Sequence, residues 1–195
     1  MDEIEIRGKV NKEGFEKLTA FLIKKAELID EYNRLTVDIS PGLDVESKTW
    51  KNPSQIDLRL KKSGRKEKIS VKVGHYASKK REEFEIDLKE GELVDALRLF
   101  EALGYKTGMV YQWKSRVYKY KDFEIKINEY PKEYYDWEIE SLNSESDPDE
   151  LANELTLHPF SEKEFQKEID WKNNNLHDLY SFEKVSEMLK EVDQK

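Results

Sequence analysis

The fold of this chain is most constrained by short stretches in which apolar and charged residues alternate with a period of two. The first stretch, residues 3–10, places Glu3, Glu5, Arg7 and Lys9 at every second position. Successive side chains of an extended strand point to opposite faces, so this stretch has one charged face and one mostly apolar face. The apolar face has to be covered, and the pattern therefore predicts a strand in a sheet that is covered on one side.

Similar alternation recurs along the chain, and it predicts about eight strands in total. Two stretches with helical spacing interrupt them, one capped by Asn11 and the other ending at Gly104. From residue 141 the composition becomes polar, and the caps Asp147, Ser161 and Ser181 predict C-terminal helices. The further predicted strands lie within residues 31–39, 56–61, 69–73, 83–88, 110–118, 123–128 and 135–140.

The composition limits the classes of protein to which the chain can belong. A chain of 195 residues with 37% hydrophobic content can bury one core, so we expect a single domain over residues 1–195, with the strands in 1–142 and helices in 143–195. A net charge of −8 disfavours nucleic acid and acidic membranes as partners. The chain has no cysteine, which excludes disulfides and thiol chemistry. We expect a cytoplasmic protein with no membrane span and no signal peptide.

The charged strand faces allow two arrangements. In an open sheet they meet water, as in any antiparallel sheet that is covered on one side. In a closed barrel with helices outside, they line a polar channel. Charges inside a channel must be paired or hydrated, so the second arrangement favours a site for a charged ligand. The periodicity alone leaves both arrangements open.

Several motifs resemble those of one known family, and they occur along the chain in the same order as in that family. Residues 3–7, Glu-Ile-Glu-Ile-Arg, are similar to the ExExK motif that opens the CYTH family, the triphosphate tunnel metalloenzymes. This family includes class IV adenylyl cyclases, thiamine triphosphatases and inorganic triphosphatases. The resemblance covers residues 1–142 and only loosely the helices beyond. The later motifs are a basic strand at 58–61, a single lysine at 71–72, an acidic strand at 83–85, KxR at 114–116 and EIE at 138–140.

The resemblance implies an α+β fold, an eight-stranded antiparallel β-barrel or tunnel with a charged interior and helices packed outside. It implies that Glu3, Glu5 and Arg7 are catalytic. Arg7 stands where the family usually has lysine; it stays protonated, so it can hold a phosphate but cannot act as a base. Asn128 stands where the family has a metal-binding aspartate. The implied metal ligands are Glu3, Glu5, Asn128, Glu138 and Glu140, with Glu83 or Glu85 assisting; the implied phosphate contacts are Arg7, Arg59, Lys61, Lys72, Lys114 and Arg116, with Lys126 as a further candidate.

Elementary chemistry agrees with this assignment. Mg²⁺ and Mn²⁺ prefer hard oxygen ligands, and crowded glutamates repel one another unless a cation is present. Phosphoryl transfer needs mainly positioning and neutralisation of the phosphate oxygens, which arginine and lysine supply. We therefore predict a phosphohydrolase that acts on a small-molecule triphosphate (inorganic, thiamine or nucleoside) in a basic tunnel with Mg²⁺ or Mn²⁺.

Two other functions stay open at this point. One is an adenylyl cyclase that makes cyclic AMP from ATP, and the other is a non-catalytic binder of triphosphate or polyphosphate. The oligomeric state also stays open, with a homodimer as one option. His75, His158 and His177 lack the spacing of metal ligands, so we predict that they are surface or packing residues.

Overall fold

The computed structural model describes residues 2–50, 56–74 and 80–193 of the chain, with the backbone alone for residues 2, 3, 80 and 193. The main sheet contains β1 (Asp2–Val10), β2 (Glu27–Asp38), β5 (Ile56–Ser63), β6 (Lys66–Val73), β7 (Lys80–Leu88), β8 (Met109–Tyr120), β9 (Phe123–Tyr130), β10 (Tyr134–Ser141) and the short β11 (Asp178–Leu179). The other elements are the hairpin β3 (Leu43–Asp44) and β4 (Thr49–Trp50), the 3₁₀ turn η1 (Pro131–Glu133), and the helices α1 (Lys12–Lys25), α2 (Leu93–Ala102), α3 (Pro148–Glu154), α4 (Glu162–Asn175) and α5 (Phe182–Asp193).

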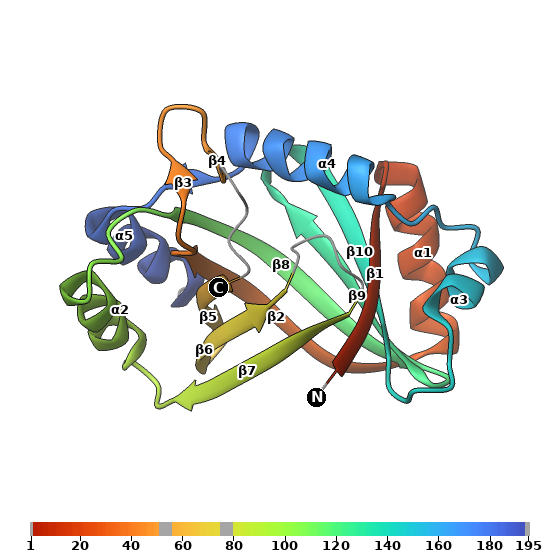
Figure 1. Ribbon diagram of the computed structural model, residues 1–195. Coiled ribbons are helices and arrows are strands. Elements are labelled where there is room, and N and C mark those ends of the chain that lie inside the picture. Colours follow the sequence, from red (N-terminus) through yellow and green to blue (C-terminus); the bar gives the residue numbers. More distant parts are fainter. Residues whose placement is uncertain (1, 51–55, 75–79, 194–195) are drawn as a thin grey trace.

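The sheet closes on itself. Its strands follow the order β8-β2-β5-β6-β7-β1-β10-β9, and β9 pairs with β8 again. Every pairing in this ring is antiparallel, and the β1–β7 pairing extends only over Asp2–Ile4. The closed arrangement is therefore confirmed, and the barrel with its surrounding helices is visible in Figure 1.

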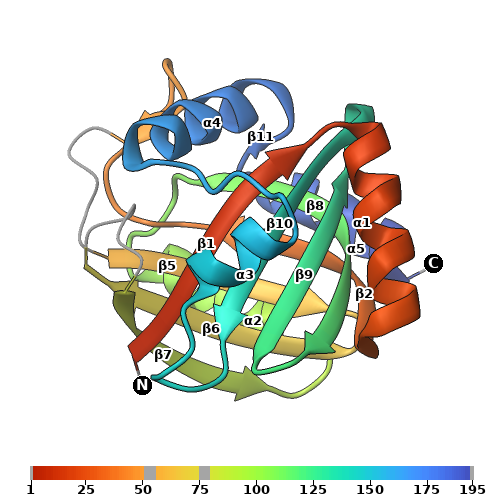
Figure 2. The same ribbon diagram turned by 90° about the vertical axis from the view of Figure 1, so that its right-hand side faces the viewer.

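Two apolar cores join the helices to the outside of the barrel. One core lies between α1, α3 and the strands β1, β8, β9 and β10, and its largest fully buried side chain is Trp137. The other lies between α2, α5 and the strands β2, β5 and β8. Figure 2 shows α1 and α3 against the outer side of β1, β9 and β10. The cover is incomplete on β7, where Phe84 and Ile86 are more than half exposed.

The helix starts follow the predicted caps. Asn11 accepts a hydrogen bond from the Gly14 amide at 2.8 Å, and Ser161 forms a capping box with Glu164 at the start of α4. The start of α2 is different, because its cap comes from a neighbouring strand. The carboxylate of Glu67 on β6 accepts hydrogen bonds from the backbone amide of Leu93 at 2.8 Å and from that of Gly91. No helix in the described part of the chain has both the length and the apolarity to span a membrane.

Gly8 on β1 is required by a close approach of two segments. A Cβ atom there would lie 2.4 Å from the carbonyl oxygen of His158 and 2.5 Å from the Trp137 ring. We expect Gly8→Ala to lower the free energy of unfolding by about 1–3 kcal/mol, because neither neighbour is free to move away. Urea unfolding followed by circular dichroism checks this, and an unchanged midpoint would contradict the packing described.

Candidate active site

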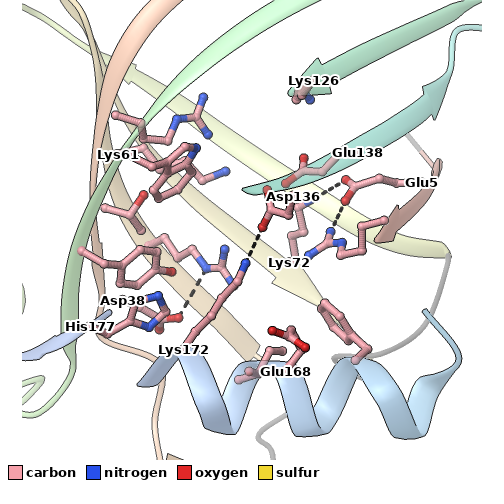
Figure 3. Close-up of a pocket in the computed structure, with 18 of the residues that line it drawn as sticks. Glu5, Asp38, Lys61, Lys72, Lys126, Asp136, Glu138, Glu168, Lys172 and His177 are labelled. Atoms are coloured by element: carbon pink, nitrogen blue, oxygen red, sulfur yellow. Dashed lines mark hydrogen bonds and ion pairs between the residues drawn. The ribbon is translucent and has the colours of Figure 1, made fainter. Parts of the chain in front are cut away.

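The barrel encloses a cavity of about 300 Å³. Inward-facing residues from all eight strands of the ring line it, together with residues of α4. Among the described residues, nine lysine or arginine and eight aspartate or glutamate side chains line it. The chain as a whole has 34 basic and 42 acidic residues, so the lining is richer in cations than the rest of the protein. The interior is thus a dense set of opposite charges (Figure 3).

Most of the predicted site residues reach this cavity. The backbone of Glu3 pairs with Arg81 of β7, but the Glu3 side chain lies outside the described part of the structure, so its position relative to the cavity is not described. Lys114, Arg116 and Asn128 do not line the cavity. The predicted residues that do line it are Glu5, Arg7, Arg59, Lys61, Lys72, Glu83, Glu85, Lys126, Glu138 and Glu140.

The predicted placement of Lys114 and Arg116 on the inner face is wrong. The Lys114 ammonium pairs with Glu31 at 2.6 Å, and the Arg116 guanidinium lies over the ring of Phe15 on α1. The inner face of β8 instead carries Tyr111 and Trp113. The basic residues of this strand face outwards, so neither of them reaches a ligand in the cavity.

Asn128 faces inwards but is enclosed. Its side-chain oxygen accepts hydrogen bonds from Ser115 Oγ at 2.6 Å and Trp113 Nε1 at 3.1 Å. Its amide nitrogen donates to Asp136 Oδ1 at 2.8 Å. Because this oxygen already accepts two hydrogen bonds, the structure does not support Asn128 as a metal ligand and gives it the role of holding Asp136 in place.

The acidic side of the cavity is set by the register of β1, β10 and β9. One row across these strands is Glu5, Glu140 and Glu124, and the next row is Arg7, Glu138 and Lys126. Directly opposed side chains on one face lie within about 4.5–5.5 Å at Cβ, so four glutamates are brought together. We call Glu5, Glu124, Glu138 and Glu140 the acid group. Glu124 shares the polar face that the sequence predicts, but it was not among the predicted ligands.

Two cations lie within the acid group. Lys126 Nζ is 2.9 Å from Glu124 and 3.1 Å from Glu140, and Arg7 donates a short hydrogen bond to Glu5. Burial lowers the pKa of Lys126, but the surrounding carboxylates, Glu138 and Glu140 first, outweigh it and raise that pKa well above its ordinary value. Burial likewise raises the pKa of Glu5, but Arg7, Lys72 and Lys126 together lower it to about 2. Both side chains are therefore charged at neutral pH.

The low pKa of Glu5 makes the free energy of unfolding depend on pH in the acidic range. Its pKa falls from 4.5 to about 2, so between these values the unfolded chain binds a proton that the folded chain does not. The ionised Glu5 therefore contributes to the free energy of unfolding above pH 4.5, and this contribution is lost as the pH falls towards about 2. We expect Glu5→Gln to flatten this loss when urea midpoints are compared between about pH 6 and about pH 3. A parallel decline in Glu5→Gln and wild type, with exposed Glu16→Gln as the control, would contradict this assignment.

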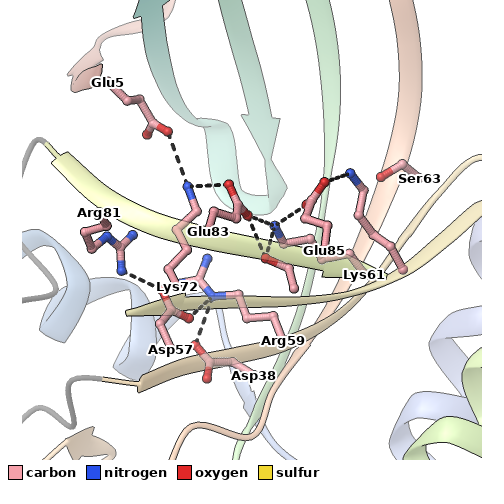
Figure 4. A network of polar contacts seen from close by, with 12 residues as sticks. Glu5, Asp38, Asp57, Arg59, Lys61, Ser63, Lys72, Arg81, Glu83 and Glu85 are labelled. Carbon is pink, nitrogen blue, oxygen red and sulfur yellow. Dashed lines mark hydrogen bonds and ion pairs between the residues drawn. The ribbon is translucent and has the colours of Figure 1, made fainter. Parts of the chain in front are cut away.

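The opposite wall carries a network of lysines on β5 and β6 (Figure 4). Lys61 Nζ donates to Ser70 Oγ at 2.9 Å and lies 3.4 Å from Glu83 on β7. Lys72 lies 3.3 Å from Glu83 and 3.8 Å from Glu5, so it connects this wall to the acid group. Burial lowers the pKa of Lys61 to about 8. Each ammonium is held by a carboxylate that an anionic ligand can replace.

Beneath these lysines lies a buried network of arginines and aspartates. The Arg59 guanidinium makes two hydrogen bonds to Asp57, at 2.6 and 3.0 Å, and lies 3.4 Å from Asp38. Arg81 on β7 donates to the same Asp57 at 3.0 Å. Burial raises the pKa of Asp38, and although Arg59 opposes this, the value is about 6. Asp38, Asp57 and Arg81 were not predicted as site residues.

Helix α4 lies across one end of the barrel (Figures 1 and 2). Its Lys172 makes a short hydrogen bond to Asp136, and its Glu168 pairs with Lys9 at 2.8 Å. Phe165 lies under the Arg7 guanidinium, 4.9 Å from the ring centre. His177, just beyond α4, is buried and stacks on Tyr111 at 3.9 Å between ring centres. The packing role predicted for His177 is confirmed, His158 is exposed as predicted, and His75 lies outside the described residues.

The donor chemistry of the acid group fits a hard divalent cation, because its side chains offer only carboxylate oxygens. Glu5, Glu138 and Glu140, which the sequence predicts as ligands, are neighbours in register. Among the described residues, however, no three histidine, aspartate or glutamate side chains are arranged so that they could hold a metal ion. Lys126 and Arg7 already pair with Glu140 and Glu5, respectively. Metal binding therefore stays a prediction.

Comparisons with known proteins identify the fold. No family model matches the sequence, and no curated protein matches it. Among solved structures, the protein PH1012 from Pyrococcus horikoshii has a TM-score of 0.62 at 23% identity, over 80% of this chain and 91% of that one. A candidate adenylate cyclase from Vibrio parahaemolyticus has a TM-score of 0.53 at 14% identity, over 95% of this chain and 97% of that one.

A third similar structure is a candidate adenylyl cyclase from Hippeastrum that is described as having a dominant triphosphatase activity. It has a TM-score of 0.52 at 17% identity, over 86% of this chain and 87% of that one. At these identities the likeness concerns the fold. The chain thus shares its fold with candidate adenylyl cyclases, and the closed antiparallel barrel that the CYTH resemblance implies is confirmed.

Proposed function

We propose that this protein binds a small-molecule triphosphate in the barrel cavity and hydrolyses it with Mg²⁺ or Mn²⁺. One observation carries the proposal: a single cavity of about 300 Å³ has Arg59, Lys61 and Lys72 among its basic residues and the glutamates of β1 and β10 among its acidic ones. Such a cavity can neutralise a chain of phosphates and hold the cation that accompanies it. The cyclase candidates with this fold, one described with triphosphatase activity, support a reaction on a triphosphate.

The basic residues would bind phosphate by exchanging partners. Lys61 and Lys72 now pair with Glu83, and a triphosphate offers the same ammonium groups a larger total negative charge than this one carboxylate. Arg59 is held in orientation by its two hydrogen bonds to Asp57, so its guanidinium is positioned in the cavity lining before the ligand arrives. Positioning and charge neutralisation are the main requirements of phosphoryl transfer.

The acidic residues would hold the metal ion. Glu5, Glu138 and Glu140 provide hard oxygen ligands on two adjacent strands. A divalent cation bound there would polarise a phosphoryl oxygen. Arg7 is a permanent cation bonded to Glu5, so its contribution is to orient this carboxylate and to hold phosphate.

A second candidate function is binding without turnover. It is favoured by the pairing of Lys126 and Arg7 with the acid group, which already neutralises part of the charge that would attract a metal ion. Cyclase activity is a third outcome that the same assay detects.

The test is an assay of the purified protein with inorganic triphosphate, thiamine triphosphate and ATP, each with and without Mg²⁺ or Mn²⁺. Metal-dependent release of orthophosphate supports hydrolysis. Formation of cyclic AMP from ATP would instead show that the protein is a cyclase. Tight binding without products would leave only the binding function. Lys72→Ala is expected to weaken binding, and Lys114→Ala on the outer face is the matched control.

A further inference from the structure

Lys126 lies inside the acid group although the charges there would suit a metal ion. Its ammonium is 2.9 Å from Glu124 on its own strand and 3.1 Å from Glu140 on the adjacent strand. It is also directly opposite Glu138 in the register of β9 and β10. One internal cation thus contacts or faces three of the four glutamates.

A divalent cation bound to these oxygens would compete with the ammonium for them. A magnesium ion binds carboxylate oxygen at about 2.0–2.1 Å, while Lys126 Nζ is 3.1 Å from the nearest oxygen of Glu140. Two cations at these distances from one oxygen repel each other. A metal ion that binds Glu140 therefore weakens the contact of Lys126 with this carboxylate and favours its release.

The displaced side chain has a suitable destination. Lysine is a flexible side chain with a point charge and three donors, so its ammonium can change partners without a backbone movement. Lys126 lines the same cavity as Arg59, Lys61 and Lys72. A phosphate group bound in this cavity would therefore have Lys126 in the same lining as these three cations.

We propose that Lys126 is an exchangeable counter-ion of the acid group: a divalent cation displaces it from Glu124 and Glu140, and the released ammonium binds a phosphate oxygen of the ligand. The inference rests on the proposed function, whose triphosphate is the ligand in question. Lys126 then opposes metal binding in the free protein and favours triphosphate binding once the metal is present. Each ligand increases the affinity for the other, because a coupling between two binding sites is reciprocal.

The experiment uses Lys126→Met, which removes the charge, and Lys126→Arg, which keeps a cation at this position. Mn²⁺ is titrated into the free protein, with unbound Mn²⁺ measured by electron paramagnetic resonance. We expect Lys126→Met to bind Mn²⁺ roughly tenfold more tightly than wild type, and Lys126→Arg to stay near wild type. Lys114→Met is the matched control, since its lysine is also paired with a glutamate but on the outer face.

A second measurement separates this role from a purely structural one. With saturating Mn²⁺, we expect Lys126→Met to bind inorganic triphosphate roughly tenfold more weakly than wild type, opposite to its change in metal affinity. Melting temperatures with and without Mn²⁺ are recorded for each variant, and a larger stabilisation of Lys126→Met than of wild type supports the proposal even if the variant is unstable without metal.

Equal Mn²⁺ affinity and equal Mn²⁺ stabilisation in wild type and Lys126→Met would overturn the proposal. The Mn²⁺ titration contains no phosphate, so the two claims fail separately. If the wild type neither binds nor hydrolyses triphosphate, the proposed function fails while a gain in metal affinity still stands. If triphosphate is hydrolysed but metal affinity does not change, the role of Lys126 alone is wrong.

Discussion

Glu138→Ala is expected to abolish metal-dependent triphosphate turnover. Glu138 lines the cavity and lies in register between Arg7 on β1 and Lys126 on β9, next to the row of Glu5, Glu140 and Glu124. We expect a fall in turnover of roughly 100-fold or more, because a bound metal contributes several kcal/mol to transition-state stabilisation and each 1.36 kcal/mol is a factor of ten. The measurement is orthophosphate release at saturating Mn²⁺ and triphosphate.

The matched control for this prediction is Glu129→Ala, since Glu129 is an exposed glutamate on β9. It should retain wild-type turnover. A Glu138→Ala protein that folds normally and keeps its rate would remove Glu138 from the metal-binding set. A loss shared equally by Glu129→Ala would indicate damage to the barrel and not to the site.

Asp57→Ala is expected to produce the largest loss of stability. Asp57 is buried and holds two guanidinium groups, those of Arg59 and Arg81. Burial raises the pKa of Asp57, but the two arginines outweigh it and lower that pKa below its ordinary value, so the carboxylate is ionised. Its removal leaves the buried Arg81 and the partly buried Arg59 without this partner, which costs about 3–5 kcal/mol.

Thermal unfolding followed by circular dichroism measures this loss. For a chain of this length a change of 1 kcal/mol shifts the melting temperature by about 2–4 °C, so we expect a decrease of roughly 6–20 °C. Glu13→Ala removes an exposed ion pair with Lys17 and should change stability by less than about 0.5 kcal/mol. Similar melting temperatures for both variants would show that the buried network contributes little.

The sequence predicted the strands and most of the charged wall because a period of two assigns each side chain to a face. Glu5, Lys61 and Glu138 reach the cavity for this reason. The same rule fails on β8, where the inner face carries aromatic Tyr111 and Trp113 and the outer face carries lysine and arginine. Both faces of this strand are of mixed character, so periodicity could not tell which one is enclosed.

The remaining site residues depend on contacts between distant segments. Lys172 meets Asp136 only because α4 crosses the end of the barrel, and Arg81 meets Asp57 only because β5 and β7 both flank β6 in the sheet. Neither contact leaves a periodic pattern in the sequence from which it could be predicted. Asp57 did lie on the predicted polar face beside Arg59, and a carboxylate two residues from an arginine on one strand face is the pattern that could have indicated this pair.

The central claim is that the barrel cavity is the triphosphate site. A crystal structure of the protein grown with Mn²⁺ and inorganic triphosphate tests it most directly. The claim predicts phosphate density within hydrogen-bonding distance of Arg59, Lys61 and Lys72, and an anomalous manganese peak beside Glu138 and Glu140. An empty cavity at saturating triphosphate, or phosphate bound only on the outer face near Lys114 and Arg116, would contradict it.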